Sequence, residues 1–447
     1  MNNVWVKYLP RFLHERIDGR YNLQRIIGNA GWLFADRVFR LIVGLFVGIW
    51  IARYLGPDQF GLYSYAIAFV SLFTSLSTLG LDGIVVRDIT RDPSSKEEIL
   101  GTVFILKLIG GIATLLLALT IISFSRPNEN LTRWLVGIIA AGAIFQSFDA
   151  IDFWFQSAVR SKYAVYAKGS AFTAIAFVKI GLIIANAPLV AFAWAGLAEI
   201  MFGALGLVVT YHKNGNSFYR WRWKYSRAKK LLNDSWPLVL SGFAIYVQAR
   251  IDQVLLGAMI GNAEVGQYSV AMRLIEFFGF IPMIVQSSVA PSVVQAKLRG
   301  EEFYWRQLIN IYRLMFIFFL IVAIPIYIFS TEIVSFLYGD AYREAGVLLS
   351  LFSIRLFFAN FGVAKSLFIT NENLFRYSLA TAFIGSLVNV TLNYLLIPRY
   401  EAVGAVWASI ASFFVTIFMM DLFFYRTRTN FKIMLLAMAT PWKLSLR

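Results

Sequence analysis

The sequence predicts an all-α integral membrane protein in which twelve transmembrane helices form two similar six-helix lobes. Three observations lead to this fold class. Apolar residues make up 59% of the chain and charged residues only 15%, whereas about a quarter of a soluble globular chain is charged. Twelve apolar windows are long enough to cross a bilayer, which takes ~20 residues. A turn motif, with its apolar flanks, recurs at almost half the length of the chain.

The predicted spans follow one another with short connections. They cover residues 31–52, 62–82, 99–124, 134–157, 163–185, 188–211, 236–260, 265–290, 311–330, 345–370, 377–397 and 403–425. The chain opens with basic residues, but its first apolar run is too long for a removable signal peptide and lacks a small-residue cleavage site. We therefore expect this run to be an uncleaved first span.

Lysine and arginine are divided unequally between the two sides of the predicted spans. With the N-terminus inside, the inner segments hold 26 of the 41 basic residues and the outer turns hold 5. Positively charged segments stay cytoplasmic, so both termini are expected in the cytoplasm. The same placement explains the net charge of +16 without nucleic acid, because these residues orient spans and contact anionic membrane lipids.

The repeat defines the expected domains. The segments ARYLGPDQFGLYSYA (52–66) and AMIGNAEVGQYSVA (258–271) share two glycines and a Tyr-Ser-x-Ala sequence at a constant offset of 205. Glycine permits the tight turn that this position needs, and an even number of spans per half makes the repeat parallel. The predicted parts are a cytoplasmic amphipathic N-terminus (1–30), a first lobe (31–211), a basic cytoplasmic linker (212–235), a second lobe (236–425) and a cytoplasmic tail (426–447).

Charged residues within the predicted spans indicate a wet interior. Each costs at least about 2.5–3.5 kcal/mol at bilayer depth, so such groups face a cavity, pair with one another, or reach the interface. The in-span residues are Arg37, Arg40, Lys107, Lys168, Lys179, Arg250, Arg273, Arg313, Arg355 and Lys365, with Asp36, Asp149, Asp152, Glu199, Asp252 and Glu276. The excess of basic over acidic groups predicts a central cationic cavity between the lobes.

Four segments carry a resemblance to a known family. They are WLFADRVFRLIVGLFVGIWIARYLGPDQFGLYSYAIAF, STLGLDGIVVRDIT, RIDQVLLGAMIGNAEVGQYSVAMRLIEF and LVNVTLNYLLIPRYEAVGAVWAS. They resemble the polysaccharide-export flippases of the O-antigen (Wzx) type, in the multidrug/oligosaccharidyl-lipid/polysaccharide exporter superfamily. The resemblance implies a MATE-like fold of two lobes in the bacterial cytoplasmic (inner) membrane. It also implies movement of an undecaprenyl-pyrophosphate-linked sugar repeat unit to the periplasmic leaflet, for lipopolysaccharide O-antigen, with polysaccharide polymerase machinery as a possible partner and no cofactor.

Arginines are the predicted ligands of the pyrophosphate, because the planar guanidinium donates in pairs to phosphate oxygens. The candidate substrate-binding residues are Arg37, Arg40, Arg250, Arg273 and Arg355. A structural alternative stays open for two of them. Arg40 is four residues from Asp36 and Arg273 is one turn from Glu276, so either can form an ion pair along its own helix.

Carboxylates in the spans are the candidate carriers of a coupling ion, H⁺ or Na⁺. Asp149 and Asp152 form one stripe of the fourth predicted span, and Glu199 in the sixth is a second candidate. The alternative is that each pairs with a lysine or arginine of a neighbouring helix. No residue pattern indicates a catalytic or metal-binding site.

Two other function classes remain at this point. A MATE-like drug or cation antiporter would share the fold but is expected to present an acidic or aromatic pocket. A membrane-embedded polysaccharide polymerase or ligase would be expected to have larger extramembrane segments than these short outer loops provide.

Overall fold

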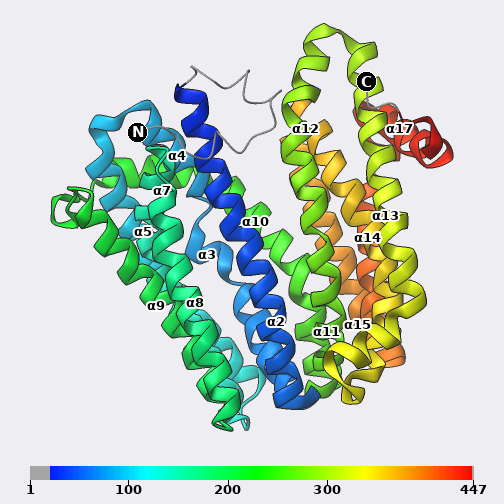
Figure 1. Cartoon of the computed structure of the whole chain (residues 1–447), viewed down its shortest axis with the longest axis horizontal. Helices are drawn as coiled ribbons and strands as arrows, with labels where there is room; N and C mark the ends of the chain where they lie inside the picture. The colour runs from blue at the N-terminus through cyan, green and yellow to red at the C-terminus, as the bar shows by residue number, and fades with distance from the viewer. Residues whose placement is uncertain (1–20, 445–447) are drawn as a thin grey trace. The chain divides into compact units, whose positions relative to one another are not determined.

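The computed structural model describes residues 21–444, and every regular element within them is helical (Figure 1). In this part of the chain, ten segments are long and apolar enough to cross a membrane. Three of them contain a non-helical backbone position, at Gly56 in α2 (Tyr21–Ser71), at Phe329 in α13 (Glu301–Tyr338) and at Glu401 in α15 (Phe375–Phe414). Of these three, only Gly56 and Glu401 have a positive φ, and counting α2 and α15 as two spans each is compatible with the predicted twelve. The all-α membrane fold is confirmed; most of the predicted amphipathic N-terminus, residues 1–20, lies outside the described residues, as do 445–447.

The chain divides into two compact units, and two of the three boundaries between them fall inside helices. The first unit holds the described residues up to Gly48 together with Phe73–Leu240, and the second holds Ile49–Leu72 together with the residues from Ser241 on. The boundaries therefore cut α2 and α10 (Tyr225–Met259). These units are defined by contacts between residues, whereas the predicted lobes are defined by the sequence repeat. The lobes therefore stay a prediction.

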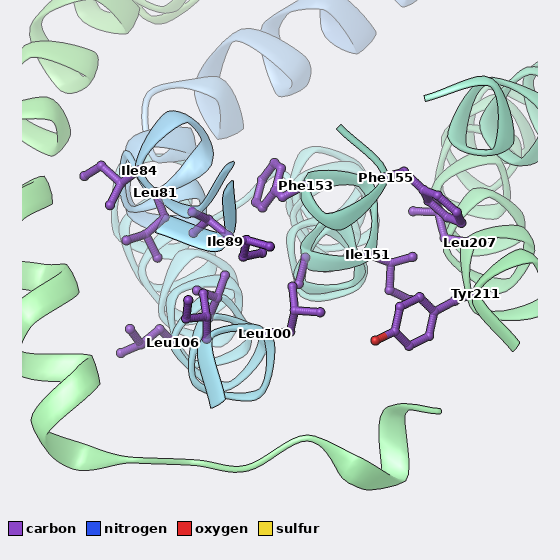
Figure 2. Close-up of a cluster of buried hydrophobic side chains, with 14 of the residues drawn as sticks. Leu81, Ile84, Ile89, Leu100, Leu106, Ile151, Phe153, Phe155, Leu207 and Tyr211 are labelled. Atoms are coloured by element: carbon purple, nitrogen blue, oxygen red, sulfur yellow. The ribbon is translucent and has the colours of Figure 1, made fainter. Parts of the chain in front are cut away.

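An apolar core joins several helices of the first unit. After α2 come α3 (Thr74–Thr78), α4 (Asp82–Arg91), α5 (Lys96–Ser125), α6 (Asn130–Phe145), α7 (Asp149–Ser157), α8 (Lys162–Ile184) and α9 (Leu189–Lys213), and α10 begins here. Figure 2 shows part of the core, in which Leu100 from α5, Ile151 from α7 and Tyr211 from α9 are fully buried. This core holds α7 beside α5 and α9, and α7 carries the two aspartates predicted to act in ion coupling.

Longer helices build the second unit. They are the remainder of α10, α11 (Asn262–Phe278), α12 (Phe280–Arg299), α13 (Glu301–Tyr338), α14 (Arg343–Asn371), α15, the π-helix η6 (Val415–Met419), α16 (Met420–Phe423) and α17 (Arg428–Ala439). A buried ion pair joins α14 to α16, since Lys365 Nζ lies 2.5 Å from Asp421 Oδ1. Lys365 also donates to the carbonyls of Thr416 and Ile417 in the π-helix.

The two repeated turns take up backbone conformations that favour glycine. Gly56 has φ 71° and Gly261 has φ 149°, a region that side chains with a Cβ rarely occupy. The chain reverses at each of these positions, and the next helical segment starts immediately after it. The prediction that glycine permits a short turn in both repeats is confirmed by these angles.

The second glycine of each repeat makes a reciprocal contact with the other repeat. A Cβ on Gly61 would lie 1.7 Å from the carbonyl oxygen of Asn262, and one on Gly266 would lie 2.1 Å from that of Pro57. At the offset of 205, Gly61 corresponds to Gly266 and Pro57 to Asn262. Each repeat therefore places the same glycine against the same carbonyl of its counterpart, as a local twofold axis requires.

Replacement of Gly61 by alanine should destabilise the second unit. The new methyl group overlaps the backbone of α11, so the two segments must separate, and overpacking of this kind costs about 1–3 kcal/mol. Gly44→Ala is the matched control, because nothing lies within 4 Å of a Cβ at Gly44 on the same helix. Thermal unfolding of the purified variants measures the difference. Equal midpoints for Gly61→Ala and Gly44→Ala would contradict the reciprocal contact.

Candidate functional site

In the first unit, a lysine of α8 lies between the two aspartates of α7. Lys168 Nζ is 2.8 Å from Asp149 Oδ1 and 2.6 Å from Asp152 Oδ2. Lys107 of α5 is 3.8 Å from both Asp149 and Asp82, and its side chain is only 1% exposed. The two aspartates are therefore neutralised by lysines of neighbouring helices, which is the structural alternative that the sequence left open.

Arg40 of α2 lies close to the same group of charged residues. Its Nε donates to Asp36 Oδ2 at 2.9 Å, as expected for residues four apart, and its guanidinium lies 5.1 Å from the centre of the Phe172 ring. The Nη2 atom is buried and has no hydrogen-bond partner among the described residues. Arg37, on the next turn of the same helix, is exposed.

Several of these charged groups line a single cavity of about 200 Å³. Arg40, Asp149, Lys168 and Glu199 all line it. Glu199 in turn pairs with Lys179 of α8 at 3.0 Å. The cavity thus brings together one predicted substrate ligand and two predicted ion carriers, with cationic and anionic groups balanced.

The second unit holds a second charged cavity of about 170 Å³, lined by Arg250, Arg273 and Glu276. Arg250 Nη2 lies 3.3 Å from Glu276 Oε1 across the α10–α11 interface. Ion pairing within α11 would have joined Arg273 to Glu276, but in the structure the glutamate accepts from Arg250. Tyr63 and Ser64 of the first repeat also line this cavity.

Arg355 of α14 is the most deeply buried of the five candidate arginines. Arg355 is 9% exposed. Its guanidinium lies 5.0 Å from the ring centre of Phe413 and 5.7 Å from that of Phe352. Cation–π contacts compensate part of the cost of burial. Nη1 nevertheless has no hydrogen-bond partner within residues 21–444, so this group is a desolvated donor.

Asp252 of α10 is a buried carboxylate that the sequence did not single out as an ion carrier. It is 1% exposed and accepts hydrogen bonds from Tyr268 Oη at 2.6 Å and Asn393 Nδ2 at 2.7 Å. Among the described residues, no lysine or arginine nitrogen lies within 4 Å of it. The sequence signal was its position within a predicted span. That its hydrogen-bond partners are neutral follows only from the packing of α11 and α15 around it.

The five candidate arginines fall into two sets. Arg37 and Arg40 belong to the first unit, and Arg250, Arg273 and Arg355 belong to the second. Within the part of the chain that is described, no group of three or more His, Asp or Glu side chains is placed to hold a metal ion. The central cavity between lobes stays a prediction.

A double-mutant cycle on Lys168 and Asp152 should give a coupling free energy of about 1–3 kcal/mol, because the pair is partly buried and in direct contact. The variants are Lys168→Gln, Asp152→Asn and both together, compared by unfolding of the purified protein. The control pair is Arg306 and Glu302, 3.6 Å apart with side chains 70% and 85% exposed, where coupling below about 0.5 kcal/mol is expected. Equal coupling in the two pairs would show that Lys168 has no special structural role.

Known proteins of similar sequence support the transporter interpretation. The chain is 24% identical over 383 residues to the probable low-salt glycan biosynthesis flippase Agl15 of Haloferax volcanii, which covers 83% of this chain and 77% of the relative. The sequence model of a family described as polysaccharide biosynthesis protein matches residues 26–276, more than half of the chain.

Solved transporters share the fold. A MATE-family transporter of the MOP superfamily, in an inward-facing conformation, aligns with a TM-score of 0.69 at 16% identity over 91% of this chain and 96% of that chain. The lipid II flippase MurJ, in an inward closed conformation, aligns with a TM-score of 0.69 at 14% identity over 91% of each chain. These two structures show the fold that the chain shares, and the sequence relative together with the family match confirms the expectation of a transporter rather than an enzyme. The chain belongs to the polysaccharide biosynthesis protein family.

Proposed function

We propose that this protein is a flippase that moves an undecaprenyl-pyrophosphate-linked sugar repeat unit from the cytoplasmic to the periplasmic leaflet by alternating access. The observation that carries the proposal is the set of arginines placed within apolar helices at cavities or with unsatisfied donors. Arg40 and Arg355 each hold a buried guanidinium nitrogen without a partner among the described residues, and Arg250 and Arg273 share a cavity. The family and the flippases among its relatives support the same cargo class.

The chemistry of the headgroup explains why arginine is needed. A buried donor without an acceptor costs about 1–3 kcal/mol, and more for a charged group. A pyrophosphate offers several anionic oxygens that accept such donors in pairs. An arginine at a small cavity therefore stabilises the headgroup while it crosses the apolar layer. Lysine supplies the charge without the planar fork.

An antiporter of drugs or cations is the second candidate, since a MATE-family transporter shares the fold. A cationic drug would be expected to bind beside an unpaired carboxylate. Asp149, Asp152 and Glu199 are each paired with a lysine, which leaves these three carboxylates poorly suited to a drug-sized cation. Asp252 has no such partner but is 1% exposed, which leaves no room beside it for a cation of that size. The in-span excess of basic residues favours the anionic cargo.

Asp252 is the carboxylate best suited to carry a coupling ion. Its hydrogen-bond donors, Tyr268 and Asn393, are neutral. Arg355 acts on it electrostatically but forms no ion pair within 4 Å, so its charge is only partly compensated at full burial. Uptake of H⁺ or Na⁺ would remove that cost. Asp149 and Asp152 already have a cation in Lys168, and Glu199 has Lys179, which makes these earlier candidates less suited to the role.

Replacement of Arg250 by alanine should abolish export of surface polysaccharide while the protein remains at normal abundance in the membrane. The side chain of Glu276, which loses its ion-pair partner in this variant, is 42% exposed. Water can therefore solvate its charge, and the folded protein loses little stability. Arg250→Lys should restore export only in part. The control is Arg306→Ala, which removes an exposed arginine of α13 and should leave export unchanged. Normal abundance together with normal export in Arg250→Ala would refute a substrate-binding role.

Replacement of Asp252 by asparagine should uncouple transport from the ion gradient without loss of substrate binding. The side chain keeps its shape and loses only the charge that an ion would compensate. The comparison variant is Asp149→Asn with Asp152→Asn, which leaves Lys168 without its partners and should lower protein abundance. Transport is measured in proteoliposomes with and without an imposed H⁺ or Na⁺ gradient. If the double variant alone loses coupling at normal abundance, the ion site lies in the first unit instead.

A further inference from the structure

One cavity of the first unit is apolar and is not used by the proposed transport mechanism. Its volume is about 690 Å³, and every residue that lines it is apolar or glycine. Phe104 of α5, Phe148 before α7, and Phe202 of α9 contribute rings, and Trp221 and Trp223 close it from the segment after α9. Phe202 is 54% exposed and Leu205 is 58% exposed, so the cavity opens on the lipid-facing side of a predicted span.

The wall formed by residues 217–224, named the belt here, is fixed to the rest of the unit. The backbone nitrogen of Arg222 donates to the Glu97 carbonyl at 3.1 Å, and that of Lys224 donates to Thr102 Oγ1 at 3.2 Å. At Gly101 the belt approaches α5 so closely that a Cβ would lie 2.6 Å from the Arg222 nitrogen. Trp221 Nε1 donates to Tyr211 Oη at 3.2 Å. The cavity is therefore preformed.

Charged and aromatic residues alternate along the belt. Trp221 and Trp223 line the cavity, whereas Arg220 and Arg222 do not and are exposed. Within residues 21–444 neither arginine has a carboxylate within 4 Å; the nearby carboxylate of Glu98 is bound by Lys224 and Arg227. Two arginines without an ion-pair partner among the described residues are thus sequence neighbours of the tryptophans that line the cavity.

We propose that this cavity binds one acyl chain of an anionic phospholipid whose phosphate group is bound by Arg220 and Arg222. Inside a bilayer the chain gains little from burial, because lipid tails are as apolar as the cavity. The headgroup therefore determines which phospholipid the cavity prefers, since basic residues at the membrane surface attract anionic lipids. The proposal is independent of the transported cargo.

The N-terminal segment of the chain is the competing occupant, and its charge argues against it. Residues 1–20 contain four basic and two acidic residues. A segment with this net positive charge would be repelled by Arg220 and Arg222, whereas an anionic lipid is complementary to them. Tethering by such a lipid would hold the belt, and with it the start of α10, at the membrane surface.

Site-resolved photocrosslinking tests the proposal. The full chain is placed in nanodiscs of phosphatidylcholine doped with phosphatidylglycerol or phosphatidylcholine that carries a photoreactive acyl chain. Cross-linked peptides are quantified by mass spectrometry. Labelling of residues 201–208 and 218–223 is normalised to residues 321–328 of α13, where Ile321, Tyr327 and Ile328 are exposed apolar side chains. Phosphatidylglycerol should label the cavity peptides about thirtyfold more than phosphatidylcholine, as expected for two basic groups at the surface.

Two double variants, each lacking two positive charges, distinguish lipid binding at this cavity from general attraction of anionic lipids to basic residues. The double variant Arg220→Gln with Arg222→Gln should reduce labelling of the cavity peptides by phosphatidylglycerol to the level seen with phosphatidylcholine. Lys229→Gln with Lys230→Gln removes the same charge from exposed positions of α10 and should retain the preference. Equal labelling by both lipids in the wild type, or equal loss in both variants, would overturn the proposal. A photoreactive side chain at Val208 that links to residues 1–20 instead of lipid would also overturn it.

Discussion

The reciprocal contact between Gly61 and Gly266 is the constraint on which the arrangement of the second unit depends. Because neither residue has a Cβ, each backbone reaches the opposing carbonyl of Asn262 or Pro57 directly. This contact aligns the Tyr-Ser sequences that follow both glycines. Tyr63 and Ser64 then line the cavity of Arg250 together with Ser269. The shared motif of the two repeats is thus a packing motif that also shapes a charged cavity.

The cost of burying charge explains how the polar groups in both units are arranged. In the first unit, charges are grouped so that each aspartate of α7 contacts Lys168. In the second unit, the buried Lys365 is compensated by Asp421. Arg355 and Asp252 have no ion-pair partner within 4 Å among the described residues, and each compensates the other only in part, through their electrostatic interaction. Groups that a structure leaves uncompensated at such cost are expected to have ligands. An anionic headgroup and a coupling cation are ligands of the required signs.

Periodicity and composition were sufficient to predict the helices, the repeat and the local Asp36–Arg40 pair, because all of these depend on spacing along the chain. The partners of Asp149 and Asp152 depend on which helix lies beside α7, and spacing does not contain that information. For Glu276 the one-turn rule suggested Arg273, yet the packing of α10 against α11 brings Arg250 to it. Asp252 was missed as an ion carrier for the same reason, since its neutral hydrogen-bond donors come from α11 and α15, which pack against α10.

The most direct test of the account is transbilayer movement of a lipid-linked glycan by the purified protein. Proteoliposomes are prepared with a fluorescent undecaprenyl-pyrophosphate oligosaccharide in both leaflets, and an impermeant enzyme that removes the label is added outside. The account predicts that the label of the inner-leaflet molecules is also removed, whereas in protein-free vesicles only the outer-leaflet share is lost. Equal protection with and without protein, in vesicles where the same preparation exchanges a cationic drug for protons, would contradict the flippase and establish the antiporter.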